Sequence, residues 1–116
     1  MSLELSVKKL NELIRDKRLV DGIEAFYADD VAMVESGGEP MVGREANRER
    51  ERAFQNGLKA WNAQLIASAV DEATGTALNQ WTIHFEHEQW GAGTLNQVAV
   101  QKWQEGRIVH EAFYKI

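Results

Sequence analysis

The sequence contains no cysteine and only one proline among its 116 residues. The lack of cysteine excludes disulfide frameworks, thiolate zinc sites, iron–sulfur clusters and cysteine nucleophiles. One proline is few for a linker or a disordered segment, and no run of about 18 apolar residues is present to cross a membrane. With 44% hydrophobic and 27% charged residues, the chain has the composition of one globular domain over residues 1–116.

A strong excess of charge of either sign is also missing. Lys and Arg number 13 and Asp and Glu number 18, which gives a net charge of −5. An acidic chain is a poor partner for nucleic acid or for an anionic membrane surface. Residues 1–9 mix charged and isolated apolar residues, unlike a signal peptide, so we expect a cytoplasmic location. Neither the phosphate-loop motif G-x-x-x-x-G-K-[ST] nor the nucleophile motif G-x-S-x-G occurs.

The first half of the chain has the spacing of helices. Ser2 can cap a helix whose apolar stripe is formed by Leu3, Val7, Leu10 and Ile14. A short helix is expected from about residue 20 to residue 27, closed by Asp29-Asp30. A short strand over 31–35 and a turn over 37–40 follow, and a third helix is expected over 44–56, ended by Gly57.

The second half of the chain alternates with a period of two. Four strands are expected over residues 58–70, 76–89, 94–104 and 107–116. The short segments 71–75, 91–93 and 105–106 between them are turn-like, so consecutive strands should be antiparallel neighbours. The sequence therefore predicts an α+β fold, ordered α-α-β-α and then a four-stranded antiparallel meander with the helices packed on one face of a curved sheet.

A succession of local motifs resembles the nuclear transport factor 2-like superfamily. The motifs are Phe26-Tyr27-Ala28-Asp29-Asp30-Val31, a turn with Pro40, and Gly43-Arg44-Glu45-Ala46. Residues 101–109 (QKWQEGRIV) resemble the last hairpin of the SnoaL-like branch. The resemblance implies a cone-shaped half-barrel closed by helices around an apolar pocket, and homodimers formed through the outer sheet face. Its members include steroid isomerases, polyketide cyclases, epoxide hydrolases, dehydratases and non-catalytic domains, so the fold leaves the function open.

Glu35 is the first candidate for chemistry. In a strand, Val31, Met33 and Glu35 share one face. Apolar neighbours would raise the pKa of the Glu35 carboxyl and suit it to act as a general base. The resemblance places Glu35 where ketosteroid isomerases carry the carboxylate that moves protons, with Met33 beside it in the pocket. The alternative is a glutamate at a strand end that points into solvent.

The rest of that isomerase site does not match this chain. The position of its oxyanion tyrosine falls on Asn11, and that of its protonated aspartate falls on Ala99. Asn11 can donate one hydrogen bond and Ala99 can donate none. Steroid isomerase activity is therefore not expected.

Arg50 is the second candidate, on the third predicted helix. Arg50 falls within the apolar face of this largely polar helix, and Asn47 falls on the border, where the family usually carries an aliphatic residue. A charge on such a face must be paired or must face a wet cavity. Arg50 then either reaches into the pocket to bind a ligand carboxylate or pair with Glu35, or extends its stem along the surface to solvent. The apolar face is defined by Ala46, Ala53, Phe54 and Leu58.

The histidines do not have the spacing of a metal site. His84 and Glu86 share one face of a strand, whereas His87 points to the opposite face, so the two histidines cannot meet at one ion as a helical pair would. We expect no metal and no cofactor. The apolar residues of this strand are expected to face the core, which leaves His84 outside. An acid/base pair of His84 with a carboxylate requires the opposite orientation.

The last strand and the aromatic residues complete the expected pocket. By alignment with the isomerases, Glu111 and Phe113 face the pocket, where Glu111 can pair with Arg50 or position water. A salt bridge in a polar patch is the alternative. Large aromatic side chains fill cores and line pocket edges, and those expected here are Phe54, Trp61, Trp81, Phe85 and Trp103. The three tryptophans can meet in one cluster.

The sequence thus predicts a homodimeric domain that binds a small organic ligand, apolar or of mixed polarity. As an enzyme it would carry out cofactor-free proton transfer such as isomerisation, cyclisation or dehydration, with Glu35 as the base and Arg50 and Asn11 stabilising an oxyanion. A non-catalytic ligand-binding or assembly domain is the competing class. An exposed Glu35, or a cone filled by tryptophan, would contradict the catalytic version.

Overall fold

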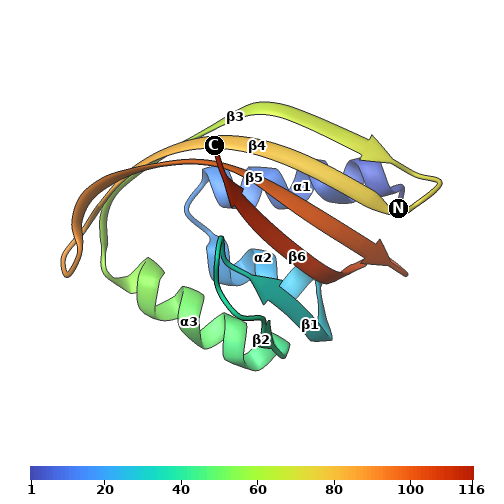
Figure 1. Cartoon of the computed structure of the whole chain (residues 1–116), viewed down its shortest axis with the longest axis horizontal. Helices are drawn as coiled ribbons and strands as arrows, with labels where there is room; N and C mark the ends of the chain where they lie inside the picture. The colour runs from blue at the N-terminus through green and yellow to red at the C-terminus, as the bar shows by residue number, and fades with distance from the viewer.

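Three helices pack against one face of a curved six-stranded sheet in the computed structural model, which describes residues 1–116 (Figure 1). The helices are α1 (Leu3–Arg15), α2 (Leu19–Phe26) and α3 (Arg44–Asn56). The strands are β1 (Tyr27–Val34), β2 (Met41–Val42), β3 (Leu58–Asp71), β4 (Thr76–His87), β5 (Gly91–Gln104) and β6 (Arg107–Lys115). The predicted α+β class is confirmed.

The sheet has the order β2-β1-β6-β5-β4-β3. Strands β3 to β6 form the expected antiparallel meander, and β1 joins it by running parallel to β6. The long strands β3, β4 and β5 arch over the helices (Figure 1). Because strands of this length twist and bend, the sheet presents a concave face toward the helices.

Local sequence explains the main elements. The Ser2 side chain accepts a hydrogen bond from the Leu5 N–H at 3.1 Å and caps α1, and the α1 stripe buries Val7 and Leu10 in the main core. In β4, Trp81, Ile83 and Phe85 face inward as predicted. His84 is exposed, with a ring nitrogen 2.9 Å from the Thr94 hydroxyl. None of the three helices is long and apolar enough to cross a membrane.

Several boundaries differ from the prediction because pairing across the sheet overrides local signals. Asp29 and Asp30 lie inside β1 and do not close α2, since β1 already begins at Tyr27, which pairs with Ile108 of β6. The segment 91–93 was predicted as a turn, yet Gly91 opens β5. The two-residue strand β2 was not predicted, because two residues carry no periodicity.

Candidate functional site

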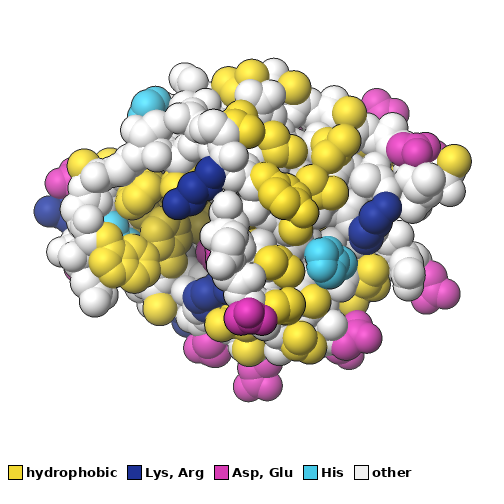
Figure 2. All heavy atoms as spheres, viewed as in Figure 1, with side chains coloured by type: hydrophobic (Ala, Val, Ile, Leu, Met, Phe, Trp, Pro, Cys, Tyr) yellow, Lys and Arg dark blue, Asp and Glu magenta, His cyan; other side chains and the backbone are white.

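A cavity of about 320 Å³ lies between the concave sheet face and the helices. Twenty residues line it, and 14 of them are hydrophobic. Figure 2 shows a hollow of hydrophobic side chains at the left of the view, between α3 and the β4–β5 hairpin. The volume is at the lower end of the roughly 300–1,000 Å³ of small-molecule sites. The cone is therefore not filled by its tryptophans, and it has room for a compact ligand.

Glu111 of β6 is a buried carboxyl in the cavity wall. The residue is only 1% exposed to solvent. The Tyr27 hydroxyl donates a hydrogen bond to Oε1, and Gln101 Nε2 donates to Oε2 at 2.7 Å. Burial raises the pKa of Glu111 to about 7, although both hydrogen bonds and the charge of Arg50 act in the opposite direction. A carboxyl group with a pKa in this range can accept and donate protons near neutral pH.

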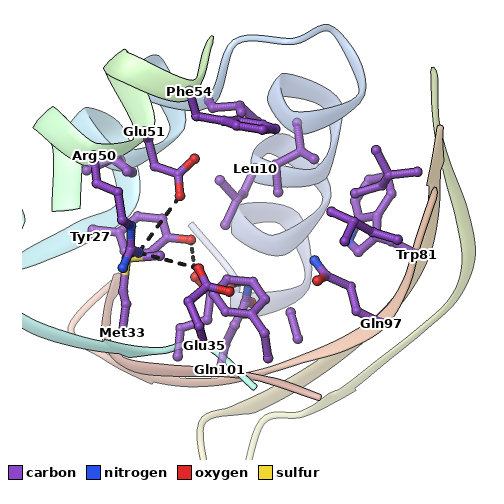
Figure 3. Close-up of a pocket in the computed structure, with 18 of the residues that line it drawn as sticks. Leu10, Tyr27, Met33, Glu35, Arg50, Glu51, Phe54, Trp81, Gln97 and Gln101 are labelled. Carbon is purple, nitrogen blue, oxygen red and sulfur yellow. Dashed lines mark hydrogen bonds and ion pairs between the residues drawn. The ribbon is translucent and has the colours of Figure 1, made fainter. Parts of the chain in front are cut away.

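Glu51 of α3 is a second carboxyl, and its side chain points into the cavity (Figure 3). The side chain is 21% exposed, and Oε1 lies 3.8 Å from Arg50 Nη2. Burial raises the pKa of Glu51 to about 7 against the lowering effect of Arg50, and the charges of Glu35 and Glu111 raise it further. The cavity therefore holds two carboxyl groups that titrate in the same range.

Glu51 is not among the predicted site residues, because the alanines of α3 suggest a different inner face. Ala46 and Ala53 are exposed, and the inward stripe is instead formed by Asn47, Glu51 and Phe54. Their spacing of four and then three residues is that of one helix face. This spacing could have indicated the inner face of α3, but a search for apolar residues does not find it because Asn47 and Glu51 are polar.

Arg50 lies between two carboxylates at the side of the cavity (Figure 3). Its Nη2 is 3.7 Å from Glu35 Oε1 and 3.8 Å from Glu51 Oε1, and the side chain is 28% exposed. The Nε atom is buried without a hydrogen-bond partner. Arg50 therefore adopts the first of its two predicted orientations, in which it faces the pocket and pairs with Glu35.

Glu35 lies at the cavity mouth, one residue beyond the end of β1. Val31 and Met33 are buried on the predicted face, but the Glu35 side chain is 55% exposed. The expected apolar enclosure of this carboxyl is wrong, because the strand ends at Val34 and the chain turns outward. The exposure of Glu35 contradicts the predicted catalytic version in which Glu35 is the base. The carboxyl groups enclosed by the cavity are Glu111 and Glu51.

The two asparagines predicted for the site do not line the cavity. Asn11 donates a hydrogen bond to Asn79 Oδ1 at 2.9 Å, inside the core. Asn47 is fully buried, and its amide donates to the carbonyls of Met41 and Gly43 at 3.0 and 2.8 Å. Asn47 thereby ties β2 to the start of α3, which explains why an amide occupies this buried position.

The predicted aromatic residues divide into two groups. Phe85 and Trp103 do not line the cavity. Trp61 and Trp81 belong to one hydrophobic cluster and Trp103 to another, so the single tryptophan cluster is not formed. Trp90, at the β4–β5 hairpin, lines the mouth. The predicted residues that do line the cavity are Met33, Glu35, Arg50, Phe54, Trp61, Trp81, Glu111 and Phe113.

An apolar cavity enclosed by three helices and a strongly curved sheet defines a class of cone-shaped α+β domains. Residues 7–111 match the model of the SnoaL-like domain, and the chain belongs to this family. No curated protein matches the chain.

Solved structures share the whole fold at low sequence identity. A provisionally assigned SnoaL-like polyketide cyclase from Mesorhizobium loti is 22% identical, with 98% of this chain and 99% of that chain covered and a TM-score of 0.80. An NTF2-like protein of unknown function from Burkholderia pseudomallei is 16% identical over 100% and 92% of the two chains, with a TM-score of 0.76. An LEH-like epoxide hydrolase from M. tuberculosis is 15% identical over 96% and 76%, with a TM-score of 0.77. These similarities establish the fold, and the site must be argued from its own residues.

Proposed function

We propose that this protein catalyses a cofactor-free proton transfer on a compact, mainly apolar organic molecule bound in the cavity. The observation that carries the proposal is that Glu111 and Glu51 face one apolar cavity, each with a pKa of about 7. Groups that titrate near neutral pH are efficient proton acceptors and donors. Two of them in one cavity can remove a proton at one position and supply one at another, as in an isomerisation, a cyclisation or a dehydration.

Arg50 and Gln97 supply the hydrogen-bond donors of the proposed site. Removing a proton next to a carbonyl group places negative charge on the carbonyl oxygen, and a cation or an amide N–H directed at that oxygen stabilises it. Arg50 lines the cavity and carries the guanidinium charge of the site. Gln97 of β5 lines the opposite side and points into the cavity (Figure 3). In this proposal Glu35 pairs with Arg50 at the mouth and does not act as the base.

The charges around the cavity favour an uncharged ligand. Arg50 already has Glu35 and Glu51 beside it, so the cavity offers no surplus positive charge to attract a carboxylate. The remaining wall is mostly apolar and aromatic, which suits a ring or a short alkyl body. A neutral cyclic ketone or enone has both the apolar body and the carbonyl oxygen that the proposed reaction needs.

Hydrogen–deuterium exchange tests the proposal directly. A panel of small cyclic ketones and enones is incubated with the protein in D₂O, and loss of the proton signal next to the carbonyl is followed by NMR. We expect at least one compound to exchange faster than with an equal amount of Glu111→Gln protein. Equal rates for both proteins across the panel would contradict the proposal and would favour the non-catalytic ligand-binding or assembly class.

We also propose that two copies of the chain pair through the outer sheet face. Leu78 and Tyr114, on this face, are 43% and 56% exposed, and their cross-strand partners Val100 and Val98 add apolar surface. Light scattering at micromolar concentration should give twice the chain mass of 13.1 kDa, and Leu78→Glu should give the single mass. A monomeric wild type would remove this proposal without affecting the cavity.

A further inference from the structure

A chain of buried hydrogen bonds approaches Glu111 from behind the cavity wall. The Trp103 indole donates to Gln101 Oε1 at 3.0 Å, and Gln101 Nε2 donates to Glu111 Oε2 at 2.7 Å. All three residues are buried. Trp103 does not line the cavity, so it reaches the site only through Gln101.

The indole determines the direction of this chain. An indole N–H can donate but cannot accept, and an amide carries a donor at one end and an acceptor at the other. The Gln101 atom that faces Trp103 must therefore be the oxygen, which leaves the amide NH₂ to face Glu111. The reversed amide would set its NH₂ against the indole N–H and its oxygen against a carboxylate oxygen. Trp103 thus excludes the orientation in which Gln101 cannot donate to Glu111.

Asn79 holds Gln101 in the same orientation from a second side. Asn79 Nδ2 lies 3.4 Å from Gln101 Oε1. Asn79 Oδ1 accepts from Asn11 Nδ2 at 2.9 Å and from the Ser68 hydroxyl at 2.7 Å. The amides of Asn11, Asn79 and Gln101 therefore each donate toward Glu111, and hydrogen bonds aligned in this way polarise one another.

Both Glu111 oxygens accept a hydrogen bond, one from Tyr27 and one from Gln101. Donors directed at a carboxyl group favour its ionised form. The charged groups that act on Glu111 are Glu35 beyond β1 and Arg50 and Glu51 on α3. Glu51 differs from Glu111 in that no hydrogen bond is directed at its carboxyl group. The Arg50 guanidinium at 3.8 Å favours its ionised form, but the charges of Glu35 and Glu111 act in the opposite direction.

We propose that Trp103 and Gln101 are positioning residues that hold Glu111 as the proton acceptor of the reaction, while Glu51 is the proton donor. The assignment of acceptor and donor rests on the proposed function. The Glu111 carboxylate takes a proton from carbon, and the C–H electron pair moves into the substrate as an enolate. The Glu51 carboxylic acid then donates its proton to another atom of the enolate. Solvent at the mouth returns the proton from Glu111 to Glu51, so atoms and charge balance.

The protonation midpoint of Glu111 in the ligand-free protein tests the positioning role. It is measured by NMR of ¹³C-labelled glutamate carboxyl groups, with the Glu51 signal as internal reference. Gln101→Leu removes the donor to Glu111 and should raise the Glu111 midpoint by about one unit. Trp103→Phe keeps an aromatic ring against Phe26 but removes the N–H that orients Gln101, and it should raise the midpoint in the same direction by less.

Trp61→Phe is the matched control. It removes an indole N–H that donates to the Ile14 carbonyl at 2.8 Å, outside the chain of amides, and should leave the Glu111 midpoint unchanged. A folded Trp103→Phe or Gln101→Leu protein with the wild-type midpoint overturns the proposal. If Gln101→Leu does not fold, Gln101→Met, which keeps the length without the donor, takes its place.

The two proposals fail in distinguishable ways. Shifted midpoints in a protein that catalyses no exchange would leave the positioning of Glu111 standing and remove the proposed function. Exchange activity with unshifted midpoints would leave the function standing and overturn the role of Trp103 and Gln101. A Trp103→Phe protein with a raised midpoint should also show the acidic limb of its pH–rate profile displaced upward by the same amount.

Discussion

Replacing Glu111 with glutamine should lower the rate of the proposed proton transfer by about 10²- to 10⁴-fold, the range that a positioned general base contributes. Glutamine has the shape of glutamate but cannot accept the substrate proton. The apolar wall that binds the ligand is unchanged, so we expect the loss in kcat while KM stays within a few-fold. The measurement is exchange kinetics on the most reactive ketone or enone of the panel.

Glu35→Gln is the matched control for this prediction, because it makes the same chemical change at the cavity mouth. The Glu35 side chain is 55% exposed and pairs with Arg50, so its loss should act only through the charge of Arg50 and should cost much less rate. A larger loss in Glu35→Gln than in Glu111→Gln would return the role of base to Glu35 and contradict the assignment made from burial.

The free energy of unfolding should decrease as the pH rises from about 5 to about 8. Glu51 and Glu111 each have a pKa raised from 4.5 to about 7 in the folded chain. Between these values the folded state binds more protons at these two groups than the unfolded state. Their contribution to stability is therefore full below 4.5 and is lost progressively until the pH passes about 7. Each pKa shift corresponds to about 3 kcal/mol of unfolding free energy. Urea denaturation at several pH values measures the combined decrease from both groups.

Glu111→Gln separates the two contributions. A neutral amide in place of Glu111 should remove about half of the decrease, so the variant should be more stable than wild type at pH 8 and differ less at pH 5. Glu86→Gln, a half-exposed residue on the outer face, should keep the wild-type slope. A wild-type stability that is flat between pH 5 and pH 8 would contradict the raised pKa values of both carboxyl groups.

The predicted loss of rate in Glu111→Gln and its predicted effect on the pH dependence of stability have one cause, the burial of Glu111. A buried carboxylate that accepts protons must pay a desolvation cost at neutral pH. The variant that loses the reaction should therefore gain stability at high pH, as is common when a strained or desolvated group is removed from an active site. Glu111→Gln should therefore lower the rate of proton transfer and raise the free energy of unfolding at pH 8.

The fold was largely predictable from the sequence because its signals are local. The Ser2 cap and the apolar stripe of α1, and the alternation of β4, each specify which face is buried. The parts that failed depend on partners far along the chain. Asp29 and Asp30 have the local signature of a helix end, but the parallel pairing of β1 with β6 places them in a strand.

The site was predictable only in part. Arg50 was found because a charge on an inner helix face requires an explanation, and Glu111 was found by alignment. No apolar periodicity points to Glu51, and the predicted apolar enclosure of Glu35 is absent from the structure. Strand parity correctly predicts which way a side chain points, yet it does not say where the strand ends or what covers it.

Local patterns in the sequence specify the family and the α+β architecture, and the lack of cysteine excludes thiol chemistry. The carboxyl groups that face the cavity follow from the tertiary structure alone. The Tyr27–Glu111 and Asn11–Asn79 hydrogen bonds join residues 84 and 68 positions apart. A pKa depends on burial and on such neighbours, and both arise only when β1, β5, β6 and α3 close around the cavity.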